Sequence, residues 1–116
     1  MDLEALRKYC LSKPAVTEEF PFNEEVLVFK VAGKMFVLTN IVDFDGINVK
    51  VDPEKGAELR EQYATIRPAF HMNKKHWITV SAGAGVTDSM ICGLVDDSYE
   101  LVVQSLSKSV RLANKI

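Results

Sequence analysis

One short polar run in the second half of the chain holds the side chains best suited to recognising a ligand. The run contains Arg67, His71, Asn73, Lys74, Lys75, His76 and Trp77. Lysine neutralises phosphate, asparagine can read the edge of an adenine, and tryptophan can stack on an exposed base. The run is therefore a candidate nucleic-acid-binding site. The alternative interpretation is a solvated turn between two strands, in which Trp77 anchors the core.

The two histidines of this run are weaker candidates for metal binding or catalysis. A metal site needs further donors, and no cysteine, aspartate or glutamate lies within several residues of His71 or His76. As general acid–base groups they lack a carboxylate neighbour in the sequence, although the fold could supply one. We expect one packed and one exposed histidine, with neither a metal nor a cofactor.

Other motifs of known chemistry are mostly absent from the chain. It has no GxSxG, HExxH, GxxxxGK[ST] or EF-hand pattern. Residues 82–85 superficially resemble a phosphate-binding loop before a helix, but they lack the lysine, so we expect a plain loop. The spacing of Asp43 and Asp45 matches no known cation-binding loop, and both are expected to be solvated. The sequence therefore favours a protein that is not an enzyme.

Composition and charge narrow the class of protein. With 116 residues, 47% of them hydrophobic and 26% charged, the chain is expected to form one globular domain over residues 1–116. Its net charge of −2 is not the basic balance typical of proteins that bind duplex DNA. Yet residues 60–85 contain four bases and one acid, Glu61. We therefore expect any DNA binding to be weak, salt-sensitive and located there.

Targeting signals and cysteine usage indicate the compartment. The charged start of the chain lacks the apolar core of a signal peptide, and no apolar run approaches the ~20 residues that cross a bilayer. Cys10 and Cys92 lie far apart, which favours free thiols over a bridge. We expect a cytoplasmic protein without membrane contact. The oligomeric state stays open, with a monomer favoured.

Hydrophobic periodicity predicts the elements that position these residues. A helix capped by Asp2 should end by Pro14, and an acidic connector over 14–25 should tuck Phe20 and Phe22 under the sheet edge. Period-two patterns predict strands near 26–31, 35–39, 47–51 and 76–80, with an irregular edge strand at 66–70. Helices should start at 52–53 and 87–88, the last one bent or divided near Gly93 or at 96–97. The order predicts an α+β fold: an antiparallel sheet with helices on one face.

Two motifs resemble a known family of small bacterial proteins, the MmcQ/YjbR family. They are HMNKKHWITV at residues 71–80 and DSYELV at 97–102, supported by the segments at 20–22, 28–36 and 48–50. The resemblance covers nearly the whole chain and implies an α+β fold related to the frataxin-like (CyaY-like) arrangement. It also implies a "double wing" DNA-binding role, whose contact region here would centre on Lys74, Lys75 and His76, with Arg67 nearby. It carries over no catalytic residue.

The sequence therefore leads to one hypothesis and two alternatives. The hypothesis is a cytoplasmic DNA-binding protein that uses a basic face around residues 67–77. The first alternative is a non-enzymatic module that binds a small molecule or a protein in a cleft near His71, His76 and Trp77. The second is an enzyme, which would need a pocket joining one of these histidines to a carboxylate.

Overall fold

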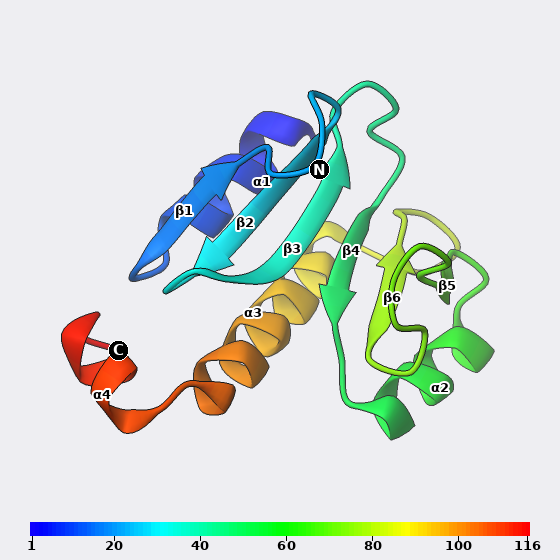
Figure 1. Cartoon of the computed structure of the whole chain (residues 1–116). Coiled ribbons are helices and arrows are strands. Elements are labelled where there is room, and N and C mark those ends of the chain that lie inside the picture. The colour runs from blue at the N-terminus through cyan, green and yellow to red at the C-terminus, as the bar shows by residue number, and fades with distance from the viewer.

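Six antiparallel strands form one sheet, in the spatial order β1-β2-β3-β4-β6-β5 (Figure 1). The computed structural model describes all residues 1–116. The elements in chain order are α1 (Leu3–Leu11), β1 (Val16–Glu19), β2 (Val26–Val31), β3 (Lys34–Asn40), β4 (Ile47–Lys50), α2 (Pro53–Gln62), β5 (Ile66–Pro68), β6 (Trp77–Val80), α3 (Asp88–Ser105) and α4 (Lys108–Ala113). None of the helices is both long and apolar enough to cross a membrane.

The three main helices begin where the sequence provides a capping side chain. Asp2 accepts a hydrogen bond from the Ala5 amide at 2.8 Å, and Thr87 caps α3 in the same way. Asp52 caps α2, with Pro53 at the first helical position. Each cap satisfies amide groups that a helix start leaves without an intrahelical partner. The predicted starts of these helices are confirmed.

The main core lies between the sheet and the two helices α1 and α3, which both lie on one face of the sheet (Figure 1). Alternate strand residues point into it, among them Phe29, Val49 and Ile78. Leu6 of α1 and Val95 of α3 meet them from the helix side, and all five are completely buried. Burying one such side chain contributes about 1.5–3 kcal/mol. The predicted α+β architecture, with helices on one face of an antiparallel sheet, is confirmed.

The other face of the sheet carries a smaller apolar cluster. Val28 of β2, Leu38 of β3 and Trp77 of β6 pack together there, and Ala69 and Met72 from the segment between β5 and β6 cover them. This segment, residues 69–76, thus takes the place of a helix over part of that face. We call the face opposite α1 and α3 the helix-free face.

A single serine of α3 joins the helix to two strands. The register of β3 with β4 includes Val37 opposite Val49 but does not extend to the next pair, Phe36 and Lys50. There the Ser98 hydroxyl accepts a hydrogen bond from the Lys50 amide at 2.9 Å and donates one to the Phe36 carbonyl at 2.6 Å. Ser98 therefore bridges the two strands where a direct backbone hydrogen bond is missing.

Several local predictions were wrong. Residues 16–19 form β1 instead of a connector, because Arg7 of α1 pairs with the Glu18 carboxylate and stabilises an acidic segment beside the sheet. Phe20 and Phe22 are 47% and 62% exposed and do not tuck under the sheet.

Helix α3 continues through Gly93 because packing of its buried face outweighs the ~1 kcal/mol that glycine costs. Helix α4 was not predicted. The expectation of free thiols is confirmed for both cysteines.

Candidate nucleic-acid interface

A polar row crosses the helix-free face over strands β4, β6 and β5. Asn48 lies opposite Thr79, and Thr79 lies opposite Arg67. The Thr79 hydroxyl donates to Asn48 Oδ1 at 2.6 Å, and Arg67 Nη2 donates to the Ser81 hydroxyl at 3.1 Å. Neighbouring residues on these strands point into the main core, so period-two alternation turns the row toward solvent. Because the Ser81 hydroxyl is neutral, it does not cancel the positive charge of Arg67.

The segment 69–76 forms a tight turn beside this row. The Asn73 carbonyl accepts hydrogen bonds from the amides of His76 and Trp77, both at 3.0 Å. Asn73 Oδ1 also accepts one from the Lys75 amide at 3.0 Å. Ala69 and Met72 anchor the turn on the apolar cluster below. The turn therefore has a fixed base, and its remaining side chains are free to face solvent.

A groove of about 460 Å³ lies between this turn and the exposed surface of β3 and β4. Its lining is apolar and amide-rich: Phe22, Val26, Met35, Leu38, Thr39, Asn40, Asn48, His71, Met72 and Asn73. A smaller hollow of about 150 Å³ adjoins it, because Asn48 and His71 line both. The smaller hollow adds Arg67 and Phe70. His71 is the one titratable side chain of the groove.

Most of the predicted site residues come together on this surface. Arg67, His71, Asn73, Lys74 and Lys75 are all exposed on the turn or on the adjoining strand. Arg67 lines the smaller hollow, Asn73 lines the groove, and His71 lines both. His76 is half-buried. The turn itself was predicted correctly.

The role predicted for Trp77 is wrong. Its side chain is only 9% exposed, because it packs against Val28 and Leu38 beneath the 69–76 segment. It cannot stack on a base without unfolding the turn. The anchoring role considered as the alternative is the one that the structure supports.

Of the fifteen residues that line the two hollows, sequence reasoning found three and missed twelve, among them Phe22, Met35, Asn40, Asn48 and Phe70. Phe70 is 67% exposed beside the cationic turn, and Lys74 Nζ lies 5.1 Å from the centre of its ring. Asn48 could have been found, because it is the polar residue of an alternating strand. Phe22 and Met35 gave no such signal. Whether they line the groove depends on which face of the sheet their segments lie on, and the local sequence does not show this.

The cations of this surface have no acidic partners. Six ion pairs occur in the structure, and none includes Arg67, Lys74 or Lys75. By contrast, Lys30 on the same face of the sheet is neutralised by Glu19. None of the residues lining the groove or the smaller hollow is acidic. The surface therefore presents uncompensated positive charge beside an uncharged groove.

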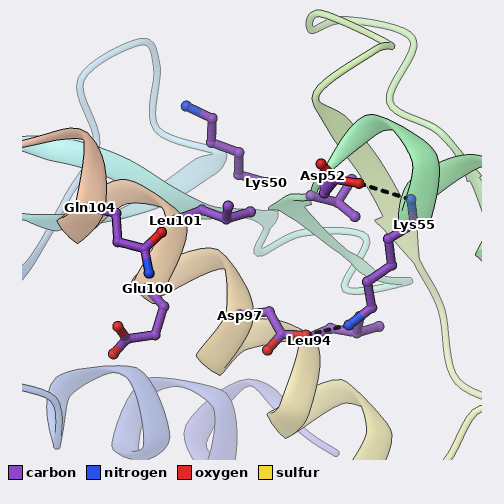
Figure 2. A pocket seen from close by; sticks show the side chains of 9 residues that line it. Lys50, Asp52, Lys55, Leu94, Asp97, Glu100, Leu101 and Gln104 are labelled. Carbon is purple, nitrogen blue, oxygen red and sulfur yellow. Dashed lines mark hydrogen bonds and ion pairs between the residues drawn. The ribbon is translucent and has the colours of Figure 1, made fainter.

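A third hollow of about 240 Å³ lies between α2 and α3 and has a different character (Figure 2). Lys55 of α2 spans it to Asp97 of α3, with Nζ 2.6 Å from Oδ2. Asp52 and Glu100 also line it. Lys50 is a second lysine of the lining, and the three carboxylates still outnumber the two lysines, so the hollow disfavours phosphate. We interpret this hollow as a junction between two helices, and it is not part of the candidate site.

Comparison with known proteins places the chain in a family. The sequence model of the YjbR family matches residues 11–101. The chain belongs to the YjbR family. It is 32% identical over 112 residues to the uncharacterized protein YjbR of Escherichia coli K12, with 96% of this chain and 95% of that one covered. It is 39% identical over 106 residues to the uncharacterized protein YbdF of Escherichia coli O157:H7, with 90% and 87% covered.

Two solved structures support the fold. The crystal structure of Deinococcus radiodurans protein DR2400, described by the family-model domain DUF419, superposes with a TM-score of 0.91 at 38% identity. That match covers 98% of this chain and 88% of the other. A Pseudomonas syringae protein superposes with a TM-score of 0.73 at 28% identity, covering 87% and 98%. The predicted family is confirmed, and the described YjbR relatives are themselves uncharacterised.

Proposed function

We propose that this YjbR protein binds DNA through its helix-free face, using the basic surface around residues 67–77. The observation that carries the proposal is the gathering of Arg67, Lys74 and Lys75 on one exposed surface without a single acidic partner. Charges that already have partners would have to be released before they could contact phosphate. These three need no such release, and phosphate contacts supply most of non-specific DNA affinity.

The same surface supports a binding function over a catalytic one. A general acid–base mechanism uses two titratable groups or a titratable group with an orienting partner. His71 is the one titratable side chain of the groove and makes no side-chain hydrogen bond. We therefore propose a protein that binds without catalysing a reaction.

The number of cations sets the expected salt dependence. Three phosphate contacts give a slope of log affinity against log salt of about −2.7 on duplex DNA. Raising the salt fourfold, from about 50 to about 200 mM, should then weaken binding about 40-fold. Arg60, a fourth base of the same stretch of sequence, lies on α2 and is not counted.

The test is fluorescence anisotropy of a labelled duplex at these two salt concentrations. The double variant Lys74→Glu/Lys75→Glu removes two of the three cations. Its matched control is Lys8→Glu/Lys108→Glu, which changes the net charge equally at two exposed lysines outside this surface that form no ion pair. We expect the first variant to abolish measurable binding and the control to retain it. Equal losses in both variants, or no binding by the native protein at about 50 mM salt, would overturn the proposal.

The groove supports a second candidate function, the binding of a small uncharged molecule. Its volume of about 460 Å³ lies within the ~300–1,000 Å³ of ligand pockets, and its lining is apolar with a few amides. Native mass spectrometry of the freshly purified protein tests this candidate. A retained small molecule that is lost in Met35→Ala would support it, and a mass equal to the bare chain after purification without dialysis would count against it.

A further inference from the structure

We infer that the groove receives one unpaired base, so that this protein binds single-stranded DNA more tightly than duplex DNA. The inference rests on the proposed function and specifies its substrate. It combines three features of the helix-free face: amide donors without acceptors, an exposed phenylalanine beside an apolar floor, and a cationic hollow that adjoins the groove.

Two asparagines of the groove have hydrogen-bond donors that the protein leaves unused. Asn40 Oδ1 accepts from the amides of Val42 and Asp43, at 2.9 and 3.0 Å. Asn73 Oδ1 accepts from the Lys75 amide at 3.0 Å. Backbone amides can only donate, so these bonds fix which end of each side chain is the oxygen. Each Nδ2 therefore remains a donor, and neither donates to a protein acceptor.

The unused donors select the kind of ligand. Amide N–H groups match carbonyl and ring-nitrogen acceptors, which every base presents on its edges. Within a duplex the Watson–Crick edge is already paired, and its acceptors are not available to a groove on a sheet face. A base without a partner offers that edge freely. Thymine, with two ring carbonyls, fits a site that supplies donors.

The groove also has surfaces that a flat ring can contact. Met35, Leu38 and Met72 provide an apolar floor that belongs to the small cluster of the helix-free face. Phe22 lines the groove with 62% of its surface exposed, and no core contact accounts for its position. Stacking a base on such a ring is expected to improve affinity about 5- to 150-fold.

The smaller hollow that adjoins the groove can bind the phosphate of the nucleotide whose base occupies the groove. Arg67 lines it, and the shared residues Asn48 and His71 connect it to the groove. A base in the groove therefore brings its backbone beside Arg67 and the cationic turn. An uncharged groove next to an uncompensated positive edge is complementary to a nucleotide, which has an uncharged ring and an anionic phosphate.

The experiment compares labelled (dT)12 with a duplex containing the same strand by fluorescence anisotropy at about 50 mM salt. Asn73→Asp keeps the oxygen that accepts from Lys75 but replaces the free donor with a carboxylate. Its matched control is Asn23→Asp, because Asn23 accepts from two backbone amides in the same way and does not line the groove. Phe22→Ala is paired with Phe20→Ala, another exposed phenylalanine outside the groove.

We expect (dT)12 to bind at least tenfold more tightly than the duplex. Phe22→Ala should remove most of that preference and leave duplex binding unchanged. Asn73→Asp should also remove most of the preference, while its added negative charge beside Lys74 and Lys75 weakens the binding of both DNAs. The two controls should retain the preference. Equal affinity for both DNAs would overturn this inference while the proposed function stands. A preference that survives both groove variants would also overturn it. If neither DNA binds, the proposed function itself fails.

Discussion

Replacing Ser98 by alanine tests whether its hydroxyl bridges β3 and β4. The side chain is completely buried, and its oxygen is hydrogen-bonded to the Lys50 amide and the Phe36 carbonyl. Because alanine lacks this oxygen, Ser98→Ala leaves both backbone groups without a partner in a place that water cannot easily reach. The substitution changes little volume, so its effect on the free energy of unfolding reports mainly on hydrogen bonding.

The expected magnitude follows from those two groups. Leaving a buried donor or acceptor unsatisfied costs about 1–3 kcal/mol, and the Lys50 amide is only partly buried. We therefore expect the free energy of unfolding to fall by about 3 kcal/mol, a large part of the ~5–15 kcal/mol typical of such domains. At roughly 4 °C per kcal/mol, the melting temperature should fall by about 12 °C.

Urea unfolding followed by tryptophan fluorescence measures this change, because Trp77 is the one tryptophan and is buried. Ser105→Ala is the control, since Ser105 is an exposed residue and its hydroxyl bonds only within α3. It should cost less than about 0.5 kcal/mol. A loss below about 1 kcal/mol in Ser98→Ala would refute the reasoning, because it would mean that the two strands can pair directly without the hydroxyl.

Three further predictions concern other parts of the molecule. Burial raises the pKa of the Cys10 thiol to about 12, so iodoacetamide should not modify it in the folded protein at pH 8. Arg7 lowers the pKa of Glu18 below its ordinary 4.5, so Glu18→Gln should be less stable than native at pH 7, with a gap that closes in melting curves as the pH falls below about 4. A Cβ on Gly46 would lie 2.7 Å from the Val80 carbonyl oxygen. Gly46→Ala should therefore lower the free energy of unfolding by about 1–3 kcal/mol in urea titration.

Signals that reside in a few neighbouring residues made much of the fold predictable. The caps at Asp2, Asp52 and Thr87 each have a backbone amide in reach within three residues, so the helix starts follow from local chemistry. The strand at 47–50 follows from alternation, and the irregular edge strand follows from Pro68, which cannot donate to a neighbouring strand. Such features need no knowledge of the tertiary structure.

The features that were missed depend on contacts between distant residues. β1 is stabilised by pairing with β2 and by the Arg7–Glu18 ion pair, neither of which a four-residue window contains. For the same reason, only one part of the candidate site, the cationic turn, could be predicted from the sequence. The cationic turn is contiguous in sequence, but the groove brings Phe22 and Met35 to His71 across the sheet. The base-stacking role predicted for Trp77 was wrong, because the sequence does not show that residues 69–76 fold back and cover its side chain.

The two outer strands of the sheet bear on how this protein behaves at high concentration. An open sheet can recruit strands from other molecules through the unpaired backbone groups of its edges. Here β5 is three residues long and ends in Pro68, which has no amide to offer. At the opposite edge, β1 is four residues long and ends in two glutamates. Neither edge is a good template for growth, so the open sheet is protected against polymerising through its strands.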